Sequence, residues 1–528
     1  MRLGPTGLIE VVCPFDAVTQ AQLRALRPRG RWQPQQGCWS FPLEAAAELQ
    51  RQLGSRFPLT PELATWFGWL AQPLPPLPPH RQLVAAAQLD QPLADGRRLL
   101  RHQRLAVRWL LARRGAVLAD AMGLGKTLSA LAAARALARL GGARLVVVAP
   151  VGLHHHWRQE AAALELHLEL HSWARLPAEL PPAGTILIVD EAHYAQSLAA
   201  ARTRALLRLA RHPRLRAIWM LSGTPMKNGR PAQLFPLLAA IGHPLAQDQH
   251  RFEELYCGGH WRERGGRRIW QASGATRLDE LRRLVRPLLL HRRKDQCLDL
   301  PPKRRHCWPV QLDADQAHAF ELSFAACLRA YRQRAARGQV RRDAEALAML
   351  TALRRLGSRH KVPSACALVE RLLADGEPVV LFTAFLVSAA ALHRHFAAHQ
   401  PLLLTGRLAA SKRQAAVDRF QAGDAPLLIA TFGTGGLGFS LHRGRHVVML
   451  ERPWTPGDAE QAEDRCHRIG MGGDGLTSHW LQLGVADQLV DGLIATKAEH
   501  IAVVLQGRRQ LLARRSLPQM VRQWLDQV

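Results

Sequence analysis

The strongest constraint on the fold is a repeated alternation of short, mostly apolar runs with longer amphipathic stretches. The first block of apolar runs lies at residues 116–119, 145–149, 186–189 and 217–221. A second block lies at residues 379–382, 402–404, 427–430, 447–450 and 478–483. Runs without polar alternation suit central strands of a parallel sheet that helices cover on both faces. The sequence therefore predicts an α/β protein with two parallel-sheet lobes in tandem.

The boundaries between these parts follow from composition. Residues 73–79 read PLPPLPP, and proline at that density excludes both helix and central strand, so a stiff linker is expected there. Residues before it combine short alternating strands with two helical stretches, and residues 313–357 have helical periodicity. The predicted organisation is a small α+β module at 1–60, a Pro-rich linker at 61–95, lobe 1 at 96–300, a helical insert at 301–357, lobe 2 at 358–510, and a C-terminal helix at 511–528.

The charge balance points to a polyanionic partner. Lys and Arg total 71 against 42 Asp and Glu, a formal net charge of +29. A GC-rich genome would explain the preference for Arg over Lys, but it does not explain the shortage of acidic residues. Such an excess attracts nucleic acid through long-range attraction and counterion release, and we favour this partner over an acidic membrane.

The remaining composition predicts a cytoplasmic protein. The 8 cysteines are scattered without a C-x-x-C pair, so neither disulfides nor a zinc site is expected. No signal-peptide pattern is present at the N-terminus, and no apolar run approaches the roughly 20 residues of a membrane span.

A phosphate-binding loop follows the first apolar run of lobe 1. Residues 119–127 read ADAMGLGKT and lead into a long Ala/Leu-rich stretch. Gly123 and Gly125 allow backbone amides to curl around phosphates, Lys126 can reach the β- and γ-phosphates, and the Thr127 hydroxyl can ligate Mg²⁺. A chance match in a turn is the alternative, but the strand–loop–helix context favours an ATP site.

A pair of carboxylates follows the apolar run 186–189. Asp190 stands where a strand would end and can hold Mg²⁺, while Glu191 can orient or deprotonate the attacking water. The start of a solvated loop is the alternative for such a pair. His193 is a candidate for coupling hydrolysis to movement, with an ordinary loop histidine as the alternative.

These residues carry a resemblance to a known family. Residues 190–193 (DEAH) and 221–228 (LSGTPMKN) resemble the second and third motifs of superfamily-two helicases in their Swi/Snf-type form. The resemblance implies two RecA-like lobes, a contact of Gln103 with adenine, and a coupling role for Ser222 and Thr224. Residues 148–150 with Trp157 resemble the motif that lies towards the DNA backbone in this family.

Lobe 2 supplies candidate cations for the transition state. Gln461, Arg465 and Arg468 are spaced so that all three share one face of an expected helix. A solvated helix face is the alternative, but residues 461–470 (QAEDRCHRIG) resemble the last motif of the family. The resemblance implies that the two arginines act on the γ-phosphate as arginine fingers, with Gln461 beside them.

Other motifs concern DNA. Residues 431–438 form a Gly-rich stretch that resembles the fifth motif of the family, which implies a DNA contact at Thr431 and coupling at Gly436. Further candidates for DNA contacts are Arg292, Arg293, Lys294 and Trp454; a solvated charged face is the alternative for the basic run. The sequence departs from the family pattern in accessory positions, namely Phe439, Ser440, Glu451, Thr455 and Met471.

The segment between the lobes is similar to the annealing-helicase branch, the HepA-related proteins. Trp270, Gly274 and residues 278–281 carry this likeness, and residues around Asp16 and Trp39 resemble the HepA-related (HARP) module more weakly. An unrelated α+β domain is the alternative for the N-terminal module.

The expected function is that of a monomeric ATP- and Mg²⁺-dependent motor that moves on double-stranded or forked DNA, with annealing or fork remodelling in DNA repair as a form of this activity. The alternatives are a strand-separating DNA or RNA helicase, for which no wedge hairpin is evident in the sequence, an ATPase that recycles RNA polymerase, and a nucleic-acid-binding scaffold with a vestigial ATP fold.

Overall fold

The computed structural model of the chain divides into two compact units. Unit 1 is Met1–Cys297 with His500–Arg509, and unit 2 is Leu298–Glu499 with Gln510–Val528. The residues that the structure describes are 1–4, 8–13, 16–26, 29–41, 45–53, 56–60, 63–64, 79–180, 184–212, 215–264, 266–336, 342–435 and 439–506. Residues 61–62 and 65–78 of the predicted Pro-rich linker and the whole predicted C-terminal helix lie outside them, whereas His80–Ala86, also expected to be linker, forms helix α4. No helix among the described residues is long and apolar enough to cross a membrane.

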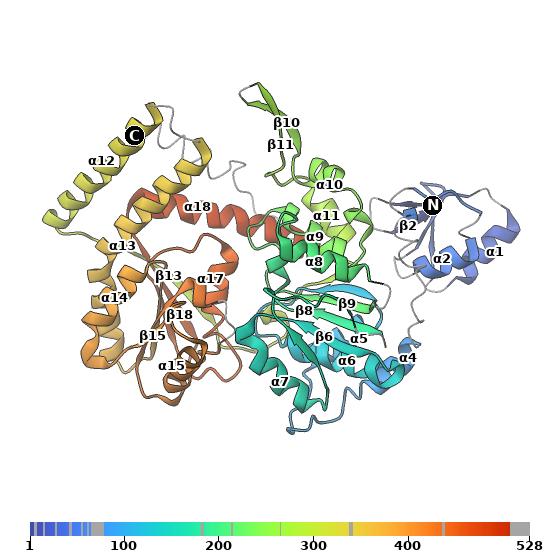
Figure 1. Ribbon diagram of the computed structural model, residues 1–528, viewed down its shortest axis with the longest axis horizontal. Coiled ribbons are helices and arrows are strands. Elements are labelled where there is room, and N and C mark those ends of the chain that lie inside the picture. The colour runs from blue at the N-terminus through green and yellow to red at the C-terminus, as the bar shows by residue number, and fades with distance from the viewer. Residues whose placement is uncertain are drawn as a thin grey trace. The chain divides into compact units, whose positions relative to one another are not determined.

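A small α+β module occupies the N-terminal part of unit 1 (Figure 1). Its antiparallel sheet has the strand order β1-β2-β4-β3. The buried Trp39 donates from Nε1 to Oε1 of Gln20 at 2.8 Å and so ties the sheet to the first helix. The elements are β1 (Arg2–Leu3), β2 (Ile9–Val11), α1 (Ala17–Ala25), β3 (Arg31–Gln33), β4 (Cys38–Phe41) and α2 (Ala46–Leu53).

The main part of unit 1 is a six-stranded sheet in the order β12-β5-β9-β8-β6-β7, and all its strand pairs are parallel. Because side chains alternate between the faces of a strand, Val117 and Leu118 enter different hydrophobic cores. The strands are β5 (Gly115–Leu118), β6 (Arg144–Val148), β7 (Glu169–His171), β8 (Thr185–Val189), β9 (Leu215–Leu221) and β12 (Leu289–Leu290).

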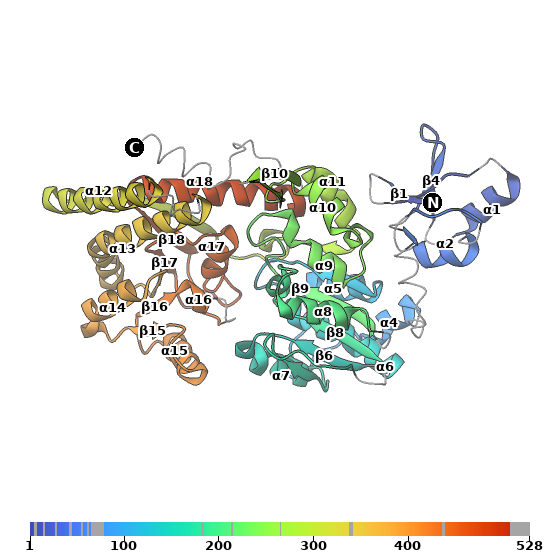
Figure 2. The same cartoon turned by 45° about the horizontal axis from the view of Figure 1, so that its top comes forward.

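Helices cover both faces of this sheet (Figures 1 and 2). One core includes Leu206 of α8 and Leu237 of α9, and the other includes Val107 of α5, Leu131 of α6 and Trp157 of α7. The helices of unit 1 are α4 (His80–Ala86), α5 (Arg101–Leu111), α6 (Lys126–Gly141), α7 (His154–Ala163), α8 (Ala201–Ala210), α9 (Phe235–Ala240), α10 (Gln249–Tyr256) and α11 (Leu278–Val285).

Unit 2 repeats this design with a second six-stranded parallel sheet, in the order β13-β18-β17-β14-β16-β15. Its strands are β13 (Lys303–Pro309), β14 (Val379–Thr383), β15 (Leu402–Leu404), β16 (Leu427–Thr431), β17 (His446–Met449) and β18 (Leu476–Gln482). Its helices are α12 (Ala314–Ala336), α13 (Arg342–Ala374), α14 (Leu386–His395), α15 (Ala410–Ala422), α16 (Phe432–Gly435), α17 (Pro456–Glu463) and α18 (Gly484–Ile501). The two parallel sheets confirm the predicted fold class.

The region expected to be a helical insert differs from the expectation in two places. Lys303–Pro309 forms β13, an edge strand that pairs with β18. Its sequence, KRRHCWP, is polar and mostly exposed, so it lacks the apolar run that marks the central strands. The helix α13 also continues through residue 358, where the second lobe was expected to begin.

A buried ion pair fastens α13 to α18 within unit 2. The ammonium of Lys361 pairs with the Asp487 carboxylate, and both side chains are almost fully buried. Lys361 Nζ also donates to the carbonyl oxygen of Leu450 at 3.1 Å, and Asp487 accepts from the backbone N–H of Leu483 at 2.6 Å. Burial lowers the pKa of Lys361, which shows that its charge is held at an energetic cost.

Lys361→Met should therefore destabilise unit 2 strongly, by about 3–5 kcal/mol, because it leaves the Asp487 carboxylate buried without its partner. Guanidinium unfolding followed by tryptophan fluorescence measures the loss. The matched control is Arg445→Ala, which removes a half-exposed guanidinium 3.5 Å from Glu377 and should cost at most about 1 kcal/mol. Equal losses in the two variants would contradict this interpretation.

Candidate nucleotide-hydrolysis site

The loop between β5 and α6 has the shape that a phosphate cradle needs. Gly123 and Gly125 have φ angles of +83° and +71°, which only glycine adopts without strain. A Cβ atom on Gly125 would also lie 2.1 Å from Nε2 of Gln103. The predicted adenine-contacting residue therefore packs against the loop, and α6 begins directly behind it at Lys126. Backbone amides and the helix N-terminus thus face the same position.

Lys126 is held within this loop. Its Nζ donates to the carbonyl oxygens of Asp120 and Ala121 at 2.8 and 3.3 Å. A Cβ atom on Gly223, which follows β9, would lie 3.4 Å from the same nitrogen. The structure thus brings Lys126 of the phosphate-binding loop close to Gly223 in the segment LSGTPMKN.

Asp190 follows β8 and is almost completely buried. Trp157 donates from Nε1 to its Oδ2 at 2.9 Å, and the backbone N–H of Glu191 donates to its Oδ1 at 2.8 Å. Burial first, and the negative charge of Glu191 second, raise the pKa of Asp190 to about 6. A buried carboxylate with this pKa favours a cation beside it.

Glu191, His193 and Ser222 lie together, although they follow two different strands. Nδ1 of His193 lies 3.0 Å from Oε2 of Glu191 and 3.5 Å from Oγ of Ser222. The backbone N–H of Thr224 donates to Oγ of Ser222 at 3.2 Å. Glu191 itself has a φ of +48°, a strained conformation for a non-glycine residue that is common at functional sites. The predicted coupling residues therefore form one contact network with the predicted catalytic glutamate.

The residues present fit a magnesium ion. Thr127 stands at the start of α6, and Asp190 supplies a carboxylate whose raised pKa reflects the energetic cost of ionisation in a buried site. Mg²⁺ in phosphate-transferring sites is usually held by one or two protein oxygens plus phosphate oxygens and water. Thr127 and Asp190 are the oxygen donors that would hold it here.

The guanidinium of Arg292 is hydrogen-bonded to residues at the ATP loop. Its Nε donates to Oδ1 of the buried Asp120 at 3.0 Å, and its Nη1 donates to the carbonyl oxygen of His102 at 2.7 Å. This ion pair anchors the start of the cradle. Arg293 donates from Nε to Oδ1 of Asp295 at 2.9 Å, and Lys294 begins a short 3-10 helix. Arg292 therefore has a structural contact at the loop, and its DNA contact stays a prediction.

The expected single helix through Gln461, Arg465 and Arg468 is wrong. Helix α17 ends at Glu463, and the arginines lie in the turns that follow. The carbonyl oxygen of Arg465 accepts from the backbone N–H of Leu441 at 2.8 Å, and the backbone N–H of Arg468 donates to the carbonyl oxygen of Cys466 at 2.9 Å. The carbonyl oxygen of Asp464 accepts from Nε of Arg468 at 2.8 Å.

The candidate DNA-contacting residues of unit 2 differ in their burial and in their contacts. Thr431 is buried at the end of β16, where its carbonyl oxygen accepts from the hydroxyl of Thr434 at 2.6 Å. Trp454 is half-buried, and the guanidinium of Arg354 lies over its ring at 4.2 Å. Gly436 lies outside the described residues.

The basic residues of β13 are also used internally. Lys303 and Arg305 both pair with the fully buried carboxylate of Glu463, at 3.2 and 2.8 Å. The guanidinium of Arg305 also lies over the ring of Trp480. These two residues fasten the edge strand to the end of α17, so they are poor candidates for a DNA path.

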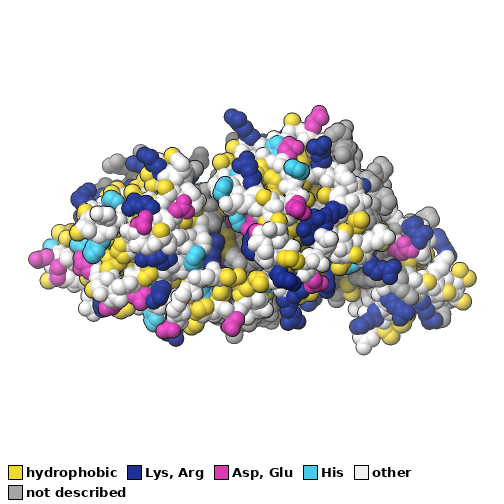
Figure 3. Space-filling model, turned by 90° about the horizontal axis from the view of Figure 1, so that it is seen from below, with side chains coloured by type: hydrophobic (Ala, Val, Ile, Leu, Met, Phe, Trp, Pro, Cys, Tyr) yellow, Lys and Arg dark blue, Asp and Glu magenta, His cyan; other side chains and the backbone are white. Residues whose placement is uncertain are grey.

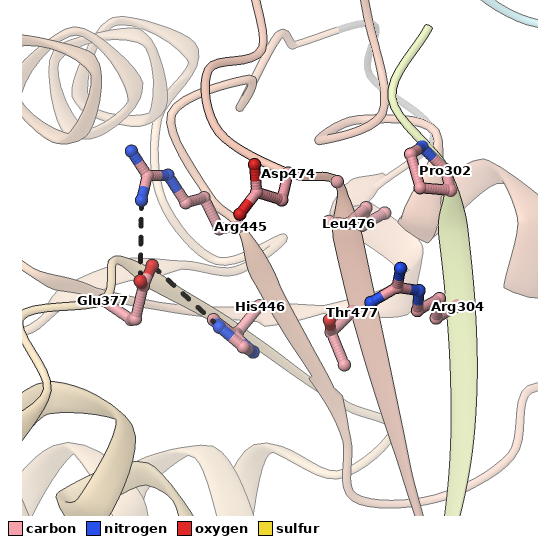
Figure 4. Close-up of a pocket in the computed structure, with 9 residues that line it drawn as sticks. Pro302, Arg304, Glu377, Arg445, His446, Asp474, Leu476 and Thr477 are labelled. Carbon is pink, nitrogen blue, oxygen red and sulfur yellow. Dashed lines mark hydrogen bonds and ion pairs between the residues drawn. The ribbon is translucent and has the colours of Figure 1, made fainter.

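A small cavity of about 150 Å³ lies in unit 2, at the amino ends of strands of its parallel sheet (Figure 4). Arg304, Arg445, His446, Leu476 and Thr477 line it near the starts of β13, β17 and β18. Ligands of parallel sheets bind at the carboxyl ends of the strands, so this cavity is not a nucleotide site.

Sequence reasoning missed the residues that hold Asp190. Trp157, which the resemblance associated with the DNA backbone, is fully buried and donates to the Asp190 carboxylate. Trp173 donates from Nε1 to the carbonyl oxygen of Asp190 at 2.9 Å. Nothing local in the sequence links these indoles to a carboxylate 33 and 17 residues away.

The two sheets and this site define a helicase-like ATPase, and comparison with known proteins identifies its family. The SNF2-related domain model matches residues 102–171 and 181–361, and the helicase conserved C-terminal domain model matches residues 361–470. The chain belongs to the SNF2-related, or Swi/Snf-type, ATPases.

Relatives of known name share this region. The mouse DNA annealing helicase and endonuclease ZRANB3 is 28% identical over 456 residues, which cover 79% of this chain and 41% of the mouse protein. The putative ATP-dependent helicase/translocase YwqA of Bacillus subtilis is 25% identical over 481 residues, which cover 79% of this chain and 50% of YwqA. The structure of the Sulfolobus solfataricus SWI2/SNF2 ATPase core with dsDNA matches 80% of this chain and 96% of that one, at 20% identity and a TM-score of 0.36. The chain spans half or less of the length of these two named relatives.

Asp190→Asn should abolish ATP hydrolysis yet stabilise the free protein at pH 7.5 by about 1–3 kcal/mol. The reason is that a pKa raised on folding makes the ionised carboxylate a cost, which grows as the pH rises towards about 6. The gain should therefore be smaller at pH 5. Thermal unfolding in EDTA at both pH values measures this effect. A variant that is less stable than wild type at pH 7.5 would contradict the sign.

Arg292→Gln should raise KM for ATP by about tenfold, because loss of a buried charge-assisted pair costs on the order of 1–3 kcal/mol at the loop. Its affinity for duplex DNA, measured by fluorescence anisotropy over a salt series, should stay within twofold of wild type. Arg293→Gln, one residue further on, is the matched control for ATP binding. A lower salt slope with unchanged KM would instead make Arg292 a phosphate contact.

Proposed function

We propose that the chain is an ATP-dependent motor that moves on double-stranded or forked DNA and remodels branched DNA. The observation that carries this proposal is the arrangement of Lys126, Asp190 and Glu191 near one loop, with His193 in contact with both the catalytic glutamate and Ser222. A site that joins the hydrolytic glutamate to the third motif is suited to convert nucleotide state into movement.

The chemistry follows from the roles of these side chains. Lys126 and the loop amides bind the β- and γ-phosphates, Asp190 and Thr127 hold Mg²⁺, which neutralises charge on the phosphates, and Glu191 orients the attacking water. We assign Gln461, Arg465 and Arg468 to stabilisation of the γ-phosphate charge in the transition state. The ionised form of Asp190 would hold the cation.

DNA as the substrate is supported by charge and by family. The net charge is +29, and Lys and Arg side chains are spread over the molecular face that Figure 3 shows. The printed names of two relatives include annealing helicase and translocase. We extend these activities to this chain as rewinding or remodelling of forked DNA, and we expect it to act as a monomer. A second candidate, strand separation, is favoured by a hairpin in unit 1, β10–β11.

The test is ATP hydrolysis without nucleic acid and then with single-stranded DNA, blunt duplex, forked DNA and RNA. We expect at least tenfold stimulation by duplex or forked DNA, because the motor grips a duplex. Glu191→Gln serves as the blank, since it keeps the fold while removing the carboxylate near the attacking water.

Three other results would replace this proposal. Stimulation by RNA alone would indicate an RNA helicase, and stimulation by RNA polymerase alone would indicate a polymerase-recycling ATPase. Hydrolysis no faster than that of Glu191→Gln in any condition would indicate a nucleic-acid-binding scaffold.

A further inference from the structure

A two-stranded antiparallel hairpin projects from unit 1 between α10 and α11. Its strands are β10 (His260–Arg264) and β11 (Arg267–Gln271), and they form a sheet of their own. Figure 1 shows the hairpin extending beyond α10 and α11. The hairpin was not evident in the sequence, because polar, arginine-rich strands carry no apolar pattern by which to recognise them.

The base of the hairpin is firmly attached. The ring of Trp270 stacks on His250 of α10 with centroids 3.8 Å apart, and its Nε1 donates to Oε2 of Glu253 at 2.6 Å. A Cβ atom on Gly259 would lie 2.3 Å from the Trp270 ring, so only glycine allows this close packing. An isolated two-stranded ribbon is marginally stable, and these contacts give it a fixed root.

The hairpin exposes one large apolar side chain on each of its faces. Trp261 is 52% exposed and Ile269 is 48% exposed. The register pairs Trp261 with Trp270 and Arg262 with Ile269, and successive pairs alternate between the faces of a ribbon. Trp261 and Ile269 therefore point to opposite sides.

The charge of the hairpin is strongly positive. Residues 260–271 contain four arginines and one acidic residue, Glu263. The Arg268 guanidinium lies 5.6 Å from the centroid of the exposed Trp261 ring, and Arg262 is exposed beside Ile269. Aromatic and arginine side chains on one exposed ribbon are the combination that binds unpaired bases by stacking and phosphates by charge.

We propose that the β10–β11 hairpin binds branched DNA at the point where the strands part, with Trp261 stacked on an unpaired base and Arg262 and Arg268 on the flanking phosphates. Bases inside a duplex present no free face, so an exposed indole can stack only at a junction, at a duplex end or on a single strand. Apolar side chains on both faces suit a position between two diverging strands. This inference rests on DNA as the substrate and adds a junction-specific contact to it.

The test measures DNA binding by fluorescence anisotropy without ATP, on a fork and on a blunt duplex of the same length. Trp261→Ala should weaken fork binding by about tenfold, the usual effect of losing one stacked base, and should leave duplex binding within twofold. Arg262→Ala with Arg268→Ala should lower the salt slope on the fork by about 1.4, because each lost phosphate contact removes roughly 0.7.

Glu263→Gln is the matched control on the same ribbon. It removes the single acidic side chain, so fork affinity should stay unchanged or rise. Basal ATP hydrolysis should match wild type in every hairpin variant, because these residues are distant in sequence from the ATP loop. Wild-type fork preference in Trp261→Ala would overturn the inference, and so would equal losses on fork and duplex in the arginine variant.

The experiment separates this inference from the proposed motor function. A wild-type chain that binds forks but is not stimulated by any DNA would refute the motor and leave the hairpin contact to be judged by Trp261→Ala alone. Strong stimulation by DNA together with unchanged fork binding in Trp261→Ala would support the motor and refute the junction contact. Competition by polyglutamate as effective as by forked DNA would show that the hairpin recognises charge only.

Discussion

The buried carboxylate of Asp190 is the constraint on which the first unit depends. An ionised carboxylate out of water is costly unless hydrogen bonds or a cation compensate it. Here Trp157 Nε1 and the Glu191 backbone N–H compensate it in part, and the pKa of about 6 shows that the compensation is incomplete. The protein thus keeps a site whose remaining cost a bound cation would offset. Stability has been exchanged for affinity at this position, as is common for functional sites.

This constraint extends beyond one residue, because the motifs of unit 1 are packed against one another. Glu191 adopts a positive φ directly after Asp190, and His193 joins it to Ser222 at the end of the neighbouring strand. Gly223 in turn lies against Lys126 of the phosphate loop. A change at the phosphates therefore has a continuous path of contacts to β9. The path is local to unit 1, and it brings three separated motifs together at one site.

The sequence predicted the strands and site residues that local sequence patterns mark. Apolar runs marked the central strands, and the ADAMGLGKT loop with the Asp190–Glu191 pair marked the site. It did not predict the pairing of Arg292 with Asp120, which is separated by 172 residues, or the packing of Trp157 on Asp190. It also misplaced the end of α17, which lies at Glu463. Beyond that end, the carbonyl oxygen of Arg465 accepts a hydrogen bond from the backbone N–H of Leu441. Each miss is a tertiary contact that overrides helical spacing or charge.

Internal ion pairs also limit what the net charge of +29 indicates about DNA binding. Arg292 supports the phosphate loop, Arg305 pairs with Glu463, and the fully buried Arg452 pairs with Asp491 at 2.6 Å. Arginines engaged in this way are poor candidates for DNA contacts, although they dominate the basic runs that a sequence reader notices first. Exposed arginines beside exposed apolar side chains, as on the β10–β11 hairpin, are better indicators of a DNA contact. Location and pairing, rather than the sum of charges, therefore identify where such a chain meets its polyanion.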